Sequence, residues 1–271
     1  MRLLVTGASS FVGAHFCSIA AARGHHVVGL WHNTPLLLPG IIAVTSDLVD
    51  FRPSKIDVVV HLACKVMGPD APALNRRMMD TVLAWGLPLV YASSTVVHWP
   101  QETTYGRARR EDEARVAASG LPAIVVRPCA PYGPAHPTHR PRHVESFARL
   151  ARIARRSPVV PVVGSADVRR QPVHVHDFAS SILGLLERGT WGSFDAGGPS
   201  PMTMRAIVAA LAGRPRLLAA VPVDVAARAG SWLGGFDPEL LRAFASDDVV
   251  DPTPLAAASG VTPRAFDPAG V

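Results

Sequence analysis

The stretch Thr6-Gly7-Ala8-Ser9-Ser10-Phe11-Val12-Gly13 decides the fold. It follows the apolar run Arg2–Thr6, which is typical of a buried parallel strand, and it opens a segment over Phe11–Arg23 with apolar residues at helical spacing. Gly7 permits the tight reversal between strand and helix, and Gly13 lets the helix lie close to the sheet. Because the first turn of a helix presents free N–H groups and the positive end of its dipole, the stretch predicts a bound pyrophosphate and hence a dinucleotide.

Strand-like and helix-like segments alternate along the first 130 residues. Apolar runs predict strands at 26–30, 41–45, 57–62, 88–92 and 123–127, and helical spacing predicts helices at 71–85 and 105–118. This alternation is typical of right-handed βαβ units, so we predict an α/β fold with a doubly wound parallel sheet of the Rossmann type. The link between Thr45 and Asp57 is too short for a full helix, so one crossover is expected to be reduced.

The regular alternation of strand-like and helix-like segments ends after Pro128. A loop rich in Pro, His and Gly spans 131–141, short pieces with frequent prolines follow, and the tail from Asp251 is expected to be irregular. We therefore predict a dinucleotide-binding domain at 1–130, with parts of 170–198 in its core. The remainder, 131–271, is predicted to form mainly a smaller substrate-binding lobe over the carboxyl ends of the strands.

Composition narrows the class of protein. The three cysteines are far apart and odd in number, so they predict neither a disulfide framework nor a metal pair. The N-terminus lacks a basic region before its first apolar run, and Pro and Gly cut the apolar runs short of a membrane span. We therefore expect a reduced cytoplasmic protein that is not bound in a membrane.

The net charge of +6 raises the question of nucleic-acid binding. The arginines are spread along the chain, and the densest group has helical spacing without interleaved aromatic residues: Arg149, Arg152, Arg155 and Arg156. That pattern predicts one solvated helix face rather than a stacking surface for single strands. We do not expect a nucleic-acid partner.

The turn and the stretches after it resemble a known family, the extended short-chain dehydrogenases or NAD-dependent epimerase/dehydratase family. Thr6, Gly7, Phe11 and Gly13 match its T-G-x-x-G-F-x-G pattern, whereas Ser10 stands in place of the middle glycine. Further stretches resemble family motifs in the same order: Ser46-Asp47-Leu48, His61-Leu62-Ala63-Cys64, Ala92-Ser93-Ser94, Tyr105-Gly106-Arg107, Arg127-Pro128 with Tyr132-Gly133-Pro134, and Arg170 through Asp177-Phe178-Ala179. The resemblance covers roughly residues 1–212 and implies a bound nicotinamide dinucleotide.

The resemblance also implies which residues hold the cofactor. They are Gly7, Ser9, Ser10, Phe11, Val12, Gly13, His32, Asp47, Leu48, Leu62, Ala63, Cys64, Tyr105, Arg109 and Pro128. NAD-binding proteins tend to carry an acid at the end of the second strand, but this chain has Leu30-Trp31-His32-Asn33 there. Because His32 does not repel a 2′-phosphate, and Arg23 is expected to lie near it, we expect NADP(H) to be preferred, with NAD(H) left open.

The family's reaction transfers a hydride while a tyrosine exchanges a proton with the substrate oxygen. The resemblance therefore implies Tyr105 as acid or base and Ser94 as the hydroxyl that holds that oxygen. A free phenol has a pKa of about 10, which a nearby cation lowers. That cation is ordinarily a lysine four residues after the tyrosine, and here it is Arg109. Either Arg109 replaces the lysine, which the Arg-rich composition favours, or the site binds cofactor without ordinary turnover.

Two further departures bear on the substrate. Ser94 and Tyr105 are only eleven positions apart, which implies a shorter loop and a smaller or more open pocket than in relatives. Thr95-Val96 follow Ser94 in place of the Asp-Glu pair of sugar-nucleotide 4,6-dehydratases, so that reaction is not expected.

The resemblance implies a substrate set of Ser94, Thr95, Tyr132 and Arg170. Arg170 occupies the position of a phosphate-binding arginine, although a solvated surface arginine is an open alternative. The asparagine that relatives use near a nucleotide-sugar diphosphate is Ala130 here. Nucleotide sugars therefore stay open as substrates but are not favoured over a small ketone, aldehyde or alcohol.

A histidine-rich loop raises the question of a metal site. His136, His139 and His143 lie together with Arg140 and Arg142, without a carboxylate or cysteine ligand. A basic loop is the simpler interpretation, so no metal is expected.

The sequence as a whole favours an NADP(H)-dependent reductase or dehydrogenase of a small carbonyl or alcohol substrate. An epimerase or lyase that retains its cofactor, acting for instance on a nucleotide sugar, is one alternative. A non-catalytic dinucleotide-binding sensor or partner protein is another. The resemblance also suggests a homodimer through the helix that contains Tyr105.

Overall fold

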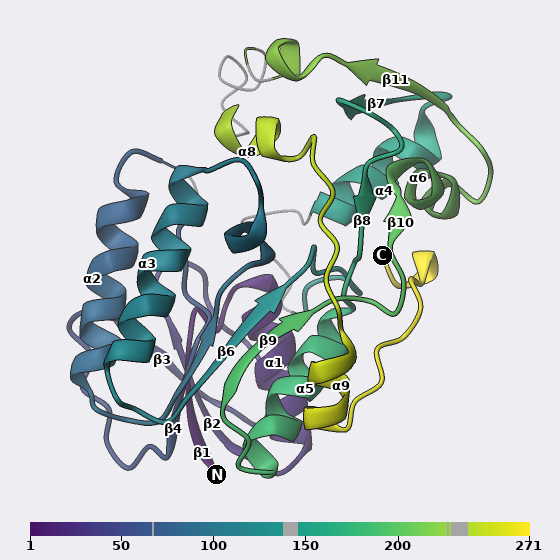
Figure 1. The fold of residues 1–271 in the computed structure, drawn as a ribbon. Coiled ribbons are helices and arrows are strands. Elements are labelled where there is room, and N and C mark those ends of the chain that lie inside the picture. The colour runs from purple at the N-terminus through teal and green to yellow at the C-terminus, as the bar shows by residue number, and fades with distance from the viewer. Residues whose placement is uncertain (67, 138–145, 227, 229–237) are drawn as a thin grey trace.

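The computed structural model describes residues 1–271 except 67, 138–145, 227 and 229–237. Within this described part, a sheet of seven parallel strands forms the centre, in the order β3-β2-β1-β4-β5-β6-β9 (Figure 1). The strands are β1 Arg2–Thr6, β2 His26–Trp31, β3 Ile42–Thr45, β4 Val58–His61, β5 Leu89–Ala92, β6 Ala123–Pro128 and β9 Gly192–Ala196. The predicted doubly wound parallel sheet is confirmed, and the link 46–57 contains no helix, as its length predicted.

Helices cover both faces of the sheet. α1 (Phe11–Ala22), α5 (Val175–Glu187) and α9 (Thr253–Ser259) pack on one face, and α2 (Ala71–Ala84) and α3 (Thr104–Ala118) on the other (Figure 1). The central strand β1 is therefore buried from both sides, and its Leu3, Leu4 and Val5 are fully inaccessible. This explains why its sequence is a continuous apolar run rather than an alternating one.

The tail corrects one expectation in part: Thr253–Ser259 form the helix α9, whereas residues 260–267 have no regular secondary structure, as expected. Pro254 lies in the first turn of α9, where a missing N–H breaks no helical hydrogen bond. α9 packs on α5 at Gly184, where a Cβ would lie 2.3 Å from the carbonyl oxygen of Ser259. The tail is fixed again by Arg264, whose Nη2 lies 2.6 Å from Oδ1 of the buried Asp177.

A second lobe lies beyond the carboxyl edge of the sheet (Figure 1). Its elements are α4 Ser146–Arg156, α6 Met204–Ala212, α8 Pro238–Ala243, the parallel pair β7 Val159–Val163 and β11 Leu217–Val221, the antiparallel pair β8 Arg169–Arg170 and β10 Met202–Thr203, and the 3₁₀ turn η2 Pro268–Gly270. Its core contains Tyr132, Phe147, Ile207 and Leu211.

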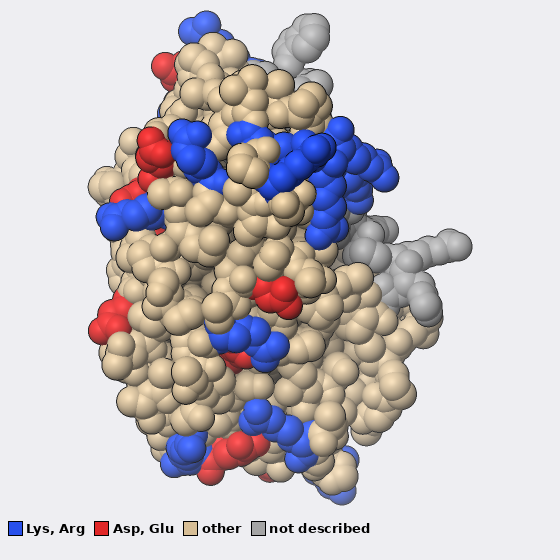
Figure 2. Space-filling model, turned by 90° about the vertical axis from the view of Figure 1, so that its right-hand side faces the viewer, with Lys and Arg blue, Asp and Glu red and all other residues tan. Residues whose placement is uncertain are grey.

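Basic side chains gather on the outside of this lobe, as Figure 2 shows in its upper part. The four arginines of α4, Arg149, Arg152, Arg155 and Arg156, are all exposed, which confirms the predicted solvated helix face. A search of the described helices found none that is both long enough and apolar enough to cross a membrane.

Candidate active site

Glycine is required at both ends of the turn between β1 and α1. Gly7 has a φ of +66°, and a Cβ there would lie 2.6 Å from the backbone nitrogen of Ala63. A Cβ on Gly13 would lie 2.2 Å from the carbonyl oxygen of Gly7. Backbone atoms cannot yield at such distances, so the strand, the turn and the helix meet as closely as the sequence predicted.

Ser10 replaces the middle glycine without strain. Its backbone is extended, with a φ of −74°, and its Oγ accepts a hydrogen bond from the N–H of Gly13 at 3.0 Å. Ser10 is therefore the N-cap of α1. The N–H groups of Phe11 and Val12, in the first helical turn, have no partner inside the helix. The turn thus keeps the features that fit a dinucleotide pyrophosphate.

The other predicted cofactor residues follow the strands of the sheet. His32 and Asp47 are exposed just after β2 and β3, and Leu62, Ala63 and Cys64 follow β4 in half-buried positions. Leu48 is buried within the turn that follows β3, and Pro128 ends β6. Because the carboxyl ends of parallel strands share one edge, the structure brings these residues to the same edge as the turn.

Ser94, Tyr105 and Arg109 come together at this edge from β5 and α3. Ser94 is the N-cap of the 3₁₀ turn η1 (Thr95–His98), which follows β5 directly. Tyr105 lies in the first turn of α3, whose N-cap Thr103 accepts a hydrogen bond from the N–H of Gly106 at 2.9 Å. One turn later, the Arg109 guanidinium carbon lies 5.0 Å from the centroid of the Tyr105 ring. The short link between Ser94 and Tyr105 thus still brings both to one place.

The pKa of Tyr105 departs from the sequence expectation. Burial raises the pKa of its phenol above the ordinary value, and this effect outweighs the charge of Arg109 and the hydrogen bonds with Arg109 and Ser94, which lower it. The phenol is therefore protonated at neutral pH. Cys64 lies against the same group, and burial raises the pKa of its thiol as well.

Arg109 is linked by hydrogen bonds to two residues that the sequence analysis did not single out, Tyr91 directly and Asp112 through Tyr91. Nη1 of Arg109 donates to Tyr91 Oη at 2.7 Å and to the carbonyl oxygen of Ala92 at 3.3 Å. Tyr91 Oη donates in turn to Oδ2 of Asp112 at 3.1 Å. Tyr91 is fully buried in β5, and Asp112 is 6% exposed on α3. A polar aromatic in a buried strand, and an acid three residues after the arginine, were the available signals.

Two predicted substrate residues have hydroxyls that are bonded inside the protein. Thr95 is 1% exposed, and its Oγ1 lies 3.1 Å from Oδ2 of Asp248. Tyr132 is fully buried in the second lobe, where its hydroxyl accepts from the N–H of Asp267 at 3.0 Å and contacts the carbonyl oxygen of Ala265. Both expectations are corrected, because these hydroxyls are already engaged inside the protein.

Arg170 and Arg23 are corrected in the same way. Arg170 is 5% exposed, and its guanidinium donates to the carbonyl oxygens of Ser246 and Phe244, so it is neither a free phosphate ligand nor a solvated surface residue. Arg23 follows the last turn of α1, at the opposite edge of the sheet, and pairs with Glu187 at 3.6 Å. Arg23 therefore cannot assist His32.

The histidine loop falls partly outside the described residues, which exclude His139 and His143. His136 is described, and its Nε2 lies 3.0 Å from the carbonyl oxygen of Ser9, beside the dinucleotide turn. Among the residues that the structure describes, no group of three or more His, Cys, Asp or Glu side chains is arranged to hold a metal ion.

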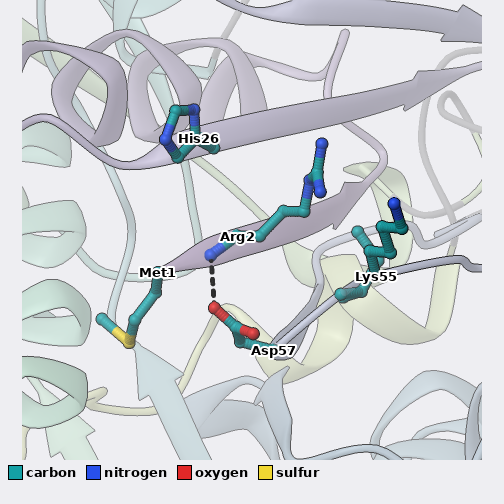
Figure 3. A pocket seen from close by; sticks show the side chains of 6 residues that line it. Met1, Arg2, His26, Lys55 and Asp57 are labelled. Carbon is teal, nitrogen blue, oxygen red and sulfur yellow. Dashed lines mark hydrogen bonds between the residues drawn. The ribbon is translucent and has the colours of Figure 1, made fainter.

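A surface pocket of about 450 Å³ lies at the other end of the sheet, at the start of β1 and β2 (Figure 3). Met1, Arg2, His26, Lys55 and Asp57 line it, and the N–H of Arg2 donates to Oδ2 of Asp57 at 2.7 Å. Open parallel sheets bind ligands at the carboxyl ends of their strands. We therefore place the candidate site at the edge with Tyr105 and not in this pocket.

Comparison with solved structures supports the fold. The chain superposes on MoeE5 in complex with UDP-glucuronic acid and NAD with a TM-score of 0.75 and 21% identity, covering 100% of this chain and 96% of that one. The UDP-glucose 4-epimerase of Thermus thermophilus, in complex with NAD, gives a TM-score of 0.73 and 20% identity with the same coverage.

Comparison of sequences gives the family. A ceramide reductase of Caulobacter vibrioides is 26% identical over 208 residues, which are 68% of this chain and 62% of that protein. The chain thus matches less than two thirds of that relative's length. The sequence profile of the NAD dependent epimerase/dehydratase family matches residues 3–195, from β1 to the last strand of the sheet. With the turn, the strand edge and the Tyr105 helix in place, the chain belongs to the NAD dependent epimerase/dehydratase family of enzymes.

Proposed function

We propose that the protein is an NADP(H)-dependent reductase of a small carbonyl compound, which can also oxidise the matching alcohol. The observation that carries the proposal is the Tyr105 phenol, held between Ser94 and Arg109 at the carboxyl edge of the sheet. Burial keeps that phenol protonated by raising its pKa. A protonated phenol is the form that reduction needs, because the carbonyl oxygen must gain a proton as its carbon gains a hydride.

The residues present fit a nicotinamide dinucleotide, which supplies the hydride chemistry when it is bound. Gly7, Gly13 and the first turn of α1 would hold its pyrophosphate. Ser94 Oγ orients the substrate oxygen, and Tyr105 Oη donates the proton to it. Arg109 stabilises the negative charge that Tyr105 then carries, and the N–H groups on the far edge of its guanidinium would bind ribose hydroxyls.

The preference for NADP(H) rests on the residues after β2. Trp31, His32 and Asn33 include no acid that would bind the ribose hydroxyls and repel a 2′-phosphate, and His32 is exposed there. NAD(H) remains the alternative, because NAD is the dinucleotide named with both structures above. Titration of the protein with NADPH and NADH decides between them, and tighter binding of NADH would reject the preference.

The proposal of a small substrate rests on two features: the site lacks groups that would bind a diphosphate, and little chain is available to enclose a large molecule. Ala130 stands where an amide would meet a diphosphate, and the guanidinium of Arg170 is engaged by carbonyl oxygens. The short η1 link leaves little chain to enclose a large substrate. The name of the Caulobacter relative, a reductase, favours net reduction over epimerisation.

Two other functions have an observation behind them. Similarity to UDP-sugar enzymes favours an epimerase that retains its cofactor. Arg109 in the place of a lysine favours a non-catalytic dinucleotide-binding protein, because a guanidinium is larger and differs in geometry from an ammonium.

The test incubates the protein with NADPH and ethyl acetoacetate or cyclohexanone and follows cofactor oxidation. Reduction is expected, with a loss of about 100-fold or more in Tyr105→Phe while the dissociation constant for NADPH stays within about threefold. Tyr132→Phe, which removes a buried hydroxyl in the second lobe, is the matched control. Conversion of UDP-glucose without net NADPH consumption would instead identify an epimerase. Binding without turnover of any probe would favour the non-catalytic function.

A further inference from the structure

Arg109 is buried in a way that fixes the orientation of its guanidinium. It is 5% exposed, and both hydrogens of Nη1 point to fixed acceptors, Tyr91 Oη and the carbonyl oxygen of Ala92. Tyr91 and Ala92 are neighbours in β5, so a rigid strand holds one edge of the guanidinium. These two bonds use only Nη1, so Nη2 and Nε keep donors that can serve Tyr105 and a bound ligand.

The charge of Arg109 is balanced through Tyr91. The phenol of Tyr91 accepts from Arg109 and donates to Asp112, so it links a buried cation to a nearly buried carboxylate. Asp112 also contacts Nη1 of Arg115 at 3.4 Å. A buried cation without a counter-charge is strongly destabilised, and each bond to a charged group in this chain is stronger than a neutral one.

Lysine and arginine differ in what they require here. An ammonium group is a compact point charge that needs no particular rotation, whereas a planar guanidinium acts only if the correct edge faces the ligand. Replacing the lysine by Arg109 therefore creates a need for an orienting partner. Tyr91 meets this need from the sheet. Its ring centroid lies 5.4 Å from the guanidinium carbon, and the Tyr105 ring centroid lies 5.0 Å from the same carbon.

We propose that Tyr91, backed by Asp112, is a positioning residue that orients Arg109 so that its guanidinium can serve Tyr105 and the cofactor ribose. This inference rests on the proposed function for its catalytic part, whereas its effect on cofactor binding does not depend on turnover. Tyr91 is fully buried and is not expected to touch substrate or cofactor. It acts through Arg109 alone, and that dependence makes the proposal testable.

The experiment is a double-mutant cycle of Tyr91→Phe and Arg109→Lys. Y91F keeps the ring and removes the hydroxyl, and we expect it to lower kcat and weaken NADPH binding by about tenfold each. In the R109K background the same change is expected to alter both by less than about twofold, because no guanidinium edge is left to orient. Tyr132→Phe is the matched control, a buried tyrosine whose hydroxyl is bonded elsewhere, and it should leave NADPH binding unchanged.

The outcomes separate this inference from the proposed function. Equal effects of Y91F in both backgrounds would reject the positioning role and leave Tyr91 as a structural tie between β5 and α3. If the wild type turns over no carbonyl probe, the proposed function fails, and the cycle measured on NADPH dissociation constants still decides the inference. Circular dichroism and thermal unfolding verify that each variant folds. Y91F removes a hydrogen-bond donor from the Asp112 carboxylate, and the variant could fail to fold for that reason. In that case Y91F/D112N, which also removes the carboxylate charge, takes its place in the same comparison.

Discussion

We expect His61 to make the stability of this protein sensitive to acid. The residue is 3% exposed, its ring stacks on Tyr91 with centroids 6.0 Å apart, and its Nδ1 lies 2.7 Å from Thr6 Oγ1. Burial, assisted by the charge of Arg109, lowers the pKa of His61 to about 3. An unfolded histidine titrates near about 6.5, so the unfolded chain binds the proton first. Stability is therefore complete above about pH 6.5 and is lost as the pH falls toward the folded pKa.

The size of the loss follows from the two pKa values. At pH 5 the unfolded histidine is almost fully charged and the folded one neutral, which costs about 2 kcal/mol relative to pH 7. Burial and neighbouring histidines lower the pKa of His15 to about 4, and burial and Arg264 lower that of His174 to about 4. Each should cost a similar amount, roughly 6 kcal/mol for the three, against a typical total stability of about 5–15 kcal/mol.

Urea unfolding followed by circular dichroism at pH 7 and pH 5 measures this loss. The variant His61→Gln keeps a polar group near Thr6 but cannot charge, so its loss should be smaller than that of the wild type by about 2 kcal/mol. His32→Gln changes an exposed histidine and is the control, with the wild-type loss expected. If H61Q lost as much stability as the wild type, the buried neutral imidazole could not be the cause.

Three more predictions test particular contacts. Gly13→Ala should abolish NADPH binding in a fluorescence titration or prevent folding, since its Cβ would lie 2.2 Å from the Gly7 carbonyl oxygen; unchanged affinity would refute the close approach. Ala130→Gly should raise the unfolding free energy by about 1 kcal/mol, measured by calorimetry, because Ala130 has a φ of +41°; a destabilised variant would contradict this. Arg23→Ala should leave the dissociation constant for NADPH within about twofold, because Arg23 lies at the far edge of the sheet; a larger change would restore it as a cofactor residue.

The fold could be predicted from local patterns because each element carries its own signal. The glycine turn, the continuous apolar run of β1 and the helical spacing of α1 all indicate the same local structure. The tail could not be predicted in this way. Its prolines suggested irregular chain, whereas the docking of α9 depends on Gly184, about 70 residues earlier in the sequence.

The candidate site likewise has a part that the sequence predicted and a part that it did not. Motif order was sufficient to bring Ser94, Tyr105 and Arg109 together, because strand ends and helix starts meet at one edge. The pKa of Tyr105 was predicted in the wrong direction, since sequence shows a charge nearby but not how far burial removes the phenol from water. The substrate set was predicted wrongly for a related reason, since the hydrogen-bond partners of its members are distant in sequence. Thr95 bonds to Asp248, Tyr132 to residues 265–267, and Arg170 to residues 244–246. No local pattern connects these positions.

In the proposed function, a hydride is transferred at this edge of the sheet while Tyr105 supplies the proton. The measurement uses NADPH that carries deuterium at both C4 positions of the nicotinamide, with ethyl acetoacetate as the carbonyl, followed by mass spectrometry of the product. We expect the alcohol to carry one deuterium on the carbon of the former carbonyl, and we expect its formation to fall by about 100-fold or more in Tyr105→Phe. An unlabelled alcohol, or a Y105F variant as fast as the wild type, would contradict the claim.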